Sequence, residues 1–162
     1  LDNILTELPV EVCNLSGLEE LSCGYNRLDS IHPRVGALVH LQRMLLPFNH
    51  LQHLPDTLSM LQSLQEVNLD GNKLEELPPA LCALSSLSSL RINHNLLQGL
   101  PPALANLMLL EDLQLCYNQL AALPRTIGYN TALTRLKLSY NKLLTVPAEI
   151  GLLHNLSELQ RS

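Results

Sequence analysis

The chain has 162 residues, of which 43 are leucine, but only one phenylalanine, four tyrosines and no tryptophan. Hydrophobic residues make up 46% and charged residues 15%, which is opposite to the balance of disordered segments, and no run approaches the roughly 18 apolar residues of a membrane helix. The net charge of −5 argues against a nucleic-acid partner, which attracts clustered Lys and Arg. A core of leucine with so few rings indicates one packing arrangement repeated many times.

An asparagine recurs every 23 residues along the chain. The series is Asn3, Asn26, Asn49, Asn72, Asn95, Asn118 and Asn141. Apolar residues repeat in phase with it, and a proline stands six positions after six of the seven asparagines, with His32 in that place after Asn26. A fixed period of this length indicates a stack of similar coils, each of which is stable only against its neighbours.

Within each unit the spacing predicts three elements in chain order. Two apolar residues at period two, such as Val67 and Leu69, predict a short strand with one buried face. The asparagine then turns the chain, and its amide is expected to bond backbone groups of the turn and of the neighbouring unit. A Leu-Pro pair follows, and the fixed φ of proline favours the start of a short helical turn, with apolar residues three apart such as Leu104 and Leu107.

The pattern L-x-x-L-x-L-x-x-N-x-L-x-x-L-P-x-x-L-x-x-L runs through the whole chain and resembles the leucine-rich repeat in its 23-residue intracellular form, as in Ras-suppressor-like and Scribble-like scaffolds. The resemblance implies an α/β fold, a right-handed solenoid with a parallel sheet on the concave face and short helical turns on the convex face. It also implies a scaffold that binds a protein partner across the concave face. The alternative is the targeting arm of a larger signalling enzyme, a kinase, phosphatase, cyclase or ubiquitin ligase, whose catalytic domain lies outside this sequence.

Residues 1–162 are expected to form one solenoid of about seven repeats. The sequence begins and ends in mid-coil without the polar caps that solenoids need, so we expect truncation at both ends, a piece of a longer protein. Its four cysteines are scattered rather than clustered. We expect them to be reduced thiols, which favours a cytoplasmic localisation.

The sequence shows no motif for catalysis. A Gly-rich phosphate loop, a nucleophile elbow and a His-Glu-x-x-His motif are all missing from it. His50 and His53 are the closest histidine pair, with Glu76 one coil away, and solvated loop histidines are a better interpretation of them than a metal site. The prediction is therefore a non-enzymatic protein without cofactor, metal, small-molecule substrate, nucleic-acid partner or membrane insertion.

The concave face is predicted to carry charges of alternating sign. Six positions before the asparagines from Asn26 to Asn141 the residues are Glu20, Arg43, Glu66, Ser89, Asp112 and Arg135, and Glu158 holds the same repeat position in the last unit. Arg91 and Lys137 stand beside this column. One interpretation is a docking surface in which Arg43, Arg91, Arg135 and Lys137 contact a partner. The other is a ladder of exposed ion pairs that satisfy one another, each worth about 0–1 kcal/mol. Leu45 and Pro47, next to Phe48, make one strand unusually apolar. A partner segment packed on Leu45 would explain this, as would a neighbouring region of the same chain.

Aromatic residues gather at one repeat position, directly before the asparagine. They are Tyr25, Phe48, Tyr117 and Tyr140, with His94 in the same position and Gly71 as the interruption. Stacked coils would align these rings along the rim of the sheet, where exposed Tyr and Phe are frequent binding hot spots. We predict partner binding there, with a gap at Gly71 that could admit a partner side chain. The alternative is that the rings only shield the asparagine turn.

One polar residue interrupts the leucines of the helical side. Asn130 stands where the other coils have leucine. The sequence predicts either a buried polar group or a local bulge in which Tyr129 turns inward to replace the missing leucine.

Overall fold

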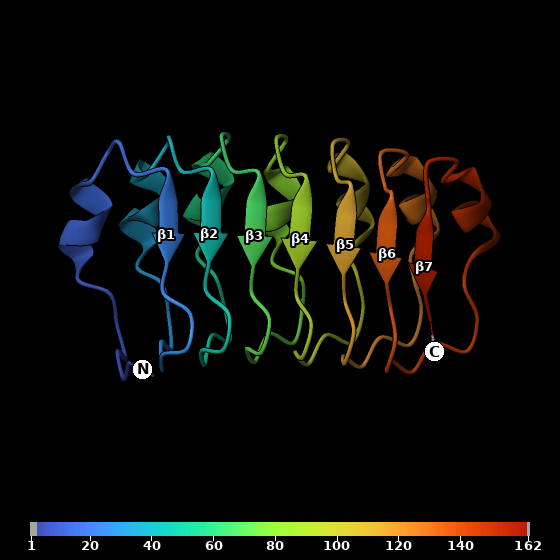
Figure 1. Ribbon diagram of the computed structural model, residues 1–162, viewed down its shortest axis with the longest axis horizontal. Helices are drawn as coiled ribbons and strands as arrows, with labels where there is room; N and C mark the ends of the chain where they lie inside the picture. Colours follow the sequence, from blue (N-terminus) through green and yellow to red (C-terminus); the bar gives the residue numbers. More distant parts are fainter. Residues whose placement is uncertain (1–2, 162) are drawn as a thin grey trace.

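The structure is a computed structural model that describes residues 3–161. In this part of the chain, seven short strands form one parallel sheet in sequence order, and a short 3-10 helix precedes each strand (Figure 1). The strands are β1 (Glu20–Ser22), β2 (Arg43–Leu45), β3 (Glu66–Asn68), β4 (Ser89–Arg91), β5 (Asp112–Gln114), β6 (Arg135–Lys137) and β7 (Glu158–Gln160). The helices are η1 (Val10–Asn14), η2 (Pro33–Ala37), η3 (Asp56–Met60), η4 (Pro79–Ala83), η5 (Pro102–Asn106), η6 (Arg125–Tyr129) and η7 (Ala148–Leu152). The predicted fold class is confirmed.

The register of the sheet equals the period of the sequence. Glu20 lies opposite Arg43, and Arg43 lies opposite Glu66, so each step between strands is one repeat of 23 residues. Residues at the same repeat position therefore form columns across the sheet, about 4.8 Å apart. Among the described residues no helix has the length and apolarity needed to cross a membrane.

The helical turns begin at the repeated prolines. Pro55, for example, has φ −71° and immediately precedes η3. The fixed φ of proline suits this position, and the turns stay short because 3-10 geometry is poor over long runs. The turn that lacks the regular proline uses another cap, since His32 Nδ1 accepts a hydrogen bond from the Arg34 backbone N–H at 3.1 Å.

The space between sheet and helical turns is filled mainly with aliphatic side chains. The middle residue of each strand from β2 to β6 is fully buried, and the first leucine after each proline from η3 to η5 is buried as well. Among the described residues, no buried hydrophobic side chain carries an aromatic ring, which explains the scarcity of rings in the composition.

The asparagines tie neighbouring coils together. Asn72 shows the pattern: its Oδ1 accepts the Leu51 N–H at 3.0 Å, and its Nδ2 donates to the carbonyls of Leu46 and Leu69, both at 3.0 Å. The side-chain oxygens of Asn26, Asn49, Asn95, Asn118 and Asn141 each accept a backbone N–H of the preceding coil in the same way. Asn3 is exposed, so this buried asparagine ladder begins at Asn26.

Of the two alternatives predicted for the helical side, the structure has the buried polar group and not the bulge. Asn130 is completely buried, and its Nδ2 donates to the carbonyls of Leu104 and Leu107 at 3.0 Å each. Tyr129 does not turn inward, because 63% of its surface is exposed. The asparagine amide finds carbonyl acceptors on the preceding coil, so no other side chain is needed to fill the place of the leucine.

Candidate protein-binding face

The aromatic residues before the asparagines share an unusual backbone conformation. Tyr25, Phe48, His94, Tyr117 and Tyr140 have φ between 53° and 58°, in the left-handed region. This conformation costs an L-residue about 1–2 kcal/mol. It turns the chain away from the end of each strand and leaves the side chain outside, so all five are exposed.

The rings form two stacks. The first ring stack is Tyr25 with Phe48, whose ring centroids are 4.8 Å apart at 22°. The second ring stack is His94, Tyr117 and Tyr140, with centroid distances of 4.1 and 4.2 Å and interplanar angles of 11° and 9°. Each stacked pair contributes about 0.5–1.5 kcal/mol, which offsets part of the backbone strain. A side-chain hydrogen bond with Tyr140 raises the pKa of Tyr117 above its ordinary value.

The interruption at Gly71 is not an open gap, contrary to the sequence prediction. A Cβ atom at this position would lie 2.5 Å from Cδ1 of Phe48, so the Phe48 ring already covers the glycine. Gly71 has φ 67° and separates the two stacks. A glycine is required here because a side chain would collide with the ring that leans over it.

The predicted basic contact residues of the sheet are engaged within the protein. Arg43 Nε lies 2.9 Å from Glu20, and Arg91 Nη2 lies 3.4 Å from Asp70. Arg135 Nη2 lies 2.9 Å from Asp112, and Lys137 Nζ lies 3.1 Å from Glu158. Each of these four cations therefore pairs with an acid. This arrangement favours the interpretation as a self-satisfied ion-pair ladder over that as a charged docking surface.

A second hydrogen-bond ladder, which was not predicted from the sequence, lies on the solvent side of the sheet, here called the sheet face. The Asn68 side chain accepts the Asp70 N–H at 3.0 Å, Asp70 accepts the Asn93 N–H at 2.7 Å, and Asn93 accepts the Cys116 N–H at 2.8 Å. These residues belong to or directly follow β3, β4 and β5. A signal was available, since Asp70 and Asn93 occupy the same position in adjacent repeats.

The residues at the same repeat position after β1 and β2, Gly24 and Pro47, form no such ladder. Gly24 has no side chain that could accept a hydrogen bond, and Pro47 has no N–H to donate. The Pro47 ring packs over Gly24, where an added Cβ would lie 2.8 Å from Cγ of the proline. Because Pro47 has no N–H, no side chain at Gly24 is needed to accept one.

A hollow of about 330 Å³ lies beside these residues. Leu5, Leu45, Pro47 and Gly24 give it apolar surface, and the rest of its lining is uncharged: Asn3, Ser22, Cys23, Tyr25, Asn26 and Asn68. Leu45 and Pro47 are only half-buried, so they offer apolar surface to the solvent. We call β1, β2 and the residues that follow them the apolar half of the sheet face, and β3 to β6 with the residues that follow them the polar half.

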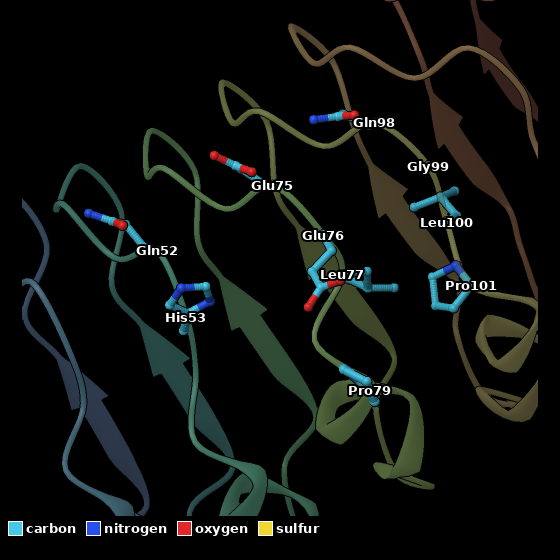
Figure 2. Close-up of a pocket in the computed structure, with 10 residues that line it drawn as sticks. All are labelled: Gln52, His53, Glu75, Glu76, Leu77, Pro79, Gln98, Gly99, Leu100 and Pro101. Carbon is cyan, nitrogen blue, oxygen red and sulfur yellow. The ribbon is translucent and has the colours of Figure 1, made fainter.

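A shallow groove on the loop edge contains His53 and Glu76, two of the residues considered above for a metal site. In Figure 2 these two side chains come from neighbouring loops, while Gln52, Glu75 and Gln98 project from the outer turns. His50 lies apart from this groove lining, with its Nδ1 3.9 Å from the Asp29 carboxylate. Residues 3–161 contain no group of three side chains that could hold a metal ion.

The four cysteines are free thiols, and burial raises the pKa of three of them. For Cys82 burial raises the pKa to about 11. At Cys116 burial is the main cause, and hydrogen bonds from Ser139 partly oppose it. The thiols of Cys23, Cys82 and Cys116 are therefore neutral near pH 7, which is unlike the thiolate of a reactive cysteine.

Comparison with known proteins agrees with this architecture. Residues 39–97 match the family model described as leucine rich repeat. A leucine-rich-repeat protein of Leptospira interrogans is 38% identical and superimposes with a TM-score of 0.94, covering 96% of this chain and 40% of that protein. No curated protein matches the sequence.

Two further solved structures are similar. The leucine-rich-repeat ectodomain of the membrane receptor kinase GASSHO1/SCHENGEN3 from Arabidopsis thaliana, in complex with Casparian strip integrity factor 2, is 30% identical with a TM-score of 0.87, covering 98% of this chain and 20% of that chain. An internalin of Listeria monocytogenes is 22% identical with a TM-score of 0.74, covering 94% of this chain and 50% of that chain, and shows a likeness of fold alone. The chain therefore spans half or less of the length of each of these proteins. From the seven-stranded sheet, the asparagine ladder and these matches, we conclude that the chain belongs to the leucine-rich-repeat family, whose fold is typical of protein–protein interaction domains.

Proposed function

We propose that this chain is a protein-recognition scaffold whose partner contacts the sheet face and the aromatic rim. The observation that carries the proposal is the pair of ring stacks, because five exposed rings are held in strained left-handed conformations along one edge. Rings immobilised in this way lose little conformational entropy on binding. The plant receptor ectodomain, which is similar in fold and bound to another protein, supports the same class of role.

The rim is favoured over the charged column as the main contact. Arg43, Arg91, Arg135 and Lys137 are already paired within the sheet, so a partner would have to compete for them. Their contribution to the proposed interface is therefore orientation rather than affinity. Exposed aromatic rings can contact a partner without first breaking an internal ion pair, and they are common interface anchors.

We also propose that the repeats are of the 23-residue intracellular form and that the protein has a signalling role in the cytoplasm. The four free thiols support that compartment, since reduced cysteines are typical of it. We further propose that the chain itself catalyses no reaction. The second candidate, the targeting arm of a signalling enzyme, is supported by the similar plant ectodomain, which belongs to a membrane receptor kinase.

The experiment starts with affinity purification of the full-length protein and identification of the protein that co-purifies. Calorimetry with that purified partner then compares the chain with the variant Phe48→Ala/Tyr117→Ala, which removes one ring from each stack. We expect affinity to fall at least about tenfold, as for hot-spot aromatic residues. Circular dichroism checks that the variant remains folded.

Tyr129→Ala is the matched control, because Tyr129 is also an exposed ring but lies on the helical side, away from the rim. It should leave affinity unchanged. If the double variant binds like the wild type, or if Tyr129→Ala alone weakens binding, the proposed site is wrong. Deletion of any attached catalytic domain separates the two candidates, because only the targeting arm depends on that domain for its cellular effect.

A further inference from the structure

The hollow on the apolar half differs from the rest of the sheet face in its chemistry. We call the apolar part of its lining, Leu5, Leu45, Pro47 and Gly24, the floor of the hollow, and Tyr25 of the first ring stack also lines it. Pro47 has no N–H, and Gly24 has no side chain, so neither brings a polar side chain to the floor. Exposed apolar surface framed by polar residues is typical of an interaction site.

The charges around the hollow determine what could fill it. Arg43 directs both Nε and Nη2 to Glu20, so this cation is engaged within the sheet. The hydrogen-bond ladder begins only at Asn68, whose oxygen is held by the Asp70 N–H. None of the residues that line the hollow carries a charge, and Leu5, Leu45 and Pro47 give it apolar surface, so an uncharged apolar group fits best.

One unpaired acid stands next to the hollow. Glu66 lies opposite Arg43 in the register of β2 and β3, and its carboxylate has no ion-pair partner among residues 3–161. Along the strand direction Glu66 is two residues from the level of Leu45, which is about 7 Å in an extended chain. An extended segment that lies along the strands would place a side chain two residues from its apolar anchor at this carboxylate.

We propose that the hollow over β1 and β2 is the anchoring subsite for an extended protein segment that carries an apolar, uncharged side chain and a Lys or Arg two residues away, with the cation meeting Glu66. This assignment rests on the proposed scaffold function and specifies the chemistry of its partner. The net charge of −5 favours a basic segment in the same sense, by steering its approach.

A phage-displayed library of random heptapeptides, selected on the immobilised chain, tests the proposal and does not require that the natural partner be identified. We expect the enriched peptides to share an aliphatic, proline or aromatic residue with Lys or Arg two positions away. The affinity of one enriched synthetic peptide is then measured by calorimetry. Leu45→Lys should weaken it at least about tenfold, because a charge would replace the apolar floor. Glu66→Lys should weaken it about fivefold at low salt and less at high salt.

Two control variants test whether an added charge alone, or a loss of folding, explains a weaker affinity. Gln114→Lys places the same charge at the same repeat position of β5, in the polar half, and should change affinity less than about twofold because it is remote from the hollow. In the variant Leu45→Asn, β2 carries the residue type that β3 has at the paired position, Asn68. We therefore expect the variant to fold, and we expect it to bind the peptide more weakly because the apolar side chain is lost.

The outcomes separate this proposal from the scaffold function. Enriched peptides that are insensitive to Leu45→Lys and Leu45→Asn but lose affinity in Tyr117→Ala would overturn the subsite and leave the scaffold function standing. Enriched peptides without a cation, or unaffected by Glu66→Lys, would overturn the assigned role of Glu66. A selection that enriches no peptide for the chain, together with unaltered partner binding in Phe48→Ala/Tyr117→Ala, would overturn both.

Discussion

The two halves of the sheet face solve the same backbone problem in different ways. In the polar half, Asp70 and Asn93 accept backbone N–H groups of the next coil, and Arg91 and Arg135 pair with acids of the preceding coil. In the apolar half, Pro47 has no N–H that a side chain at Gly24 would have to accept, and Leu45 is half-buried. Polar side chains that are committed to internal bonds are less available to a partner.

Exposure alone does not identify a binding surface in a repeat protein. Gly71 marks the border on the rim, where the Phe48 ring ends the first stack and His94 begins the second. Both halves present rings of similar exposure, but only the apolar half combines them with an apolar floor. Substitutions placed on either side of Gly71 can therefore locate where this difference begins and ends.

The largest expected effect should be the same in both halves, because the asparagine ladder lies beneath both. Asn49→Ala and Asn95→Ala each leave a buried N–H and buried carbonyls without their partner, which costs about 2–3 kcal/mol of unfolding free energy. Urea denaturation of the two variants measures this loss. A loss in only one of them would mean that the halves differ in their interior as well as on their face.

The border residue should respond next most strongly. Gly71→Ala introduces a Cβ that collides with Phe48 and places an L-residue in the left-handed region, at a cost of about 2 kcal/mol. Gly99→Ala is the control, because nothing lies within 4 Å of an added Cβ there. Thermal denaturation compares the two. Equal melting temperatures would contradict the close contact between Phe48 and Gly71.

The surface ladder should contribute less than the buried one. Asn93→Ala removes the acceptor of the Cys116 N–H, with an expected loss of about 1 kcal/mol. Ser22→Ala in the apolar half changes an exposed side chain and should be neutral within about 0.5 kcal/mol. Urea denaturation again gives both values. A neutral Asn93→Ala would show that the ladder adds nothing to stability.

The smallest effect is expected on the helical side, away from both halves. Asn130→Leu removes two hydrogen bonds and also a buried Oδ1 that has no partner. The two carbonyl acceptors keep their bonds from the Leu107 and Leu110 N–H groups. The unfolding free energy should therefore change by less than about 1 kcal/mol. A larger loss on denaturation would assign a specific structural role to this amide.

The sequence was sufficient for the fold because a 23-residue period fixes the register of every strand. The spacing of Val67, Leu69 and Asn72 alone defines strand, buried face and turn. The ring column could also be placed, since a shared repeat position becomes a spatial column in any stack. That these rings bind a partner stays a prediction.

Other features depended on contacts between coils, which spacing does not describe. The openness of Gly71 was wrongly predicted because the Phe48 ring reaches across one coil. The inward turn of Tyr129 was wrong because Asn130 finds carbonyl acceptors in the preceding coil. The second ladder was missed because it depends on the direction in which the N–H groups of Asn93 and Cys116 point.

Native-state amide hydrogen exchange by NMR tests the division of the sheet face most directly. The amides of Asn93 and Cys116 should exchange slowly in the wild type, because side chains of the preceding coil hold them. In Asn93→Ala the Cys116 amide should lose its protection while the backbone amide of residue 93, held by Asp70, keeps it. Rapid exchange of both amides in the wild type, or loss of protection throughout the sheet in the variant, would contradict the account that the polar half is committed to internal hydrogen bonds.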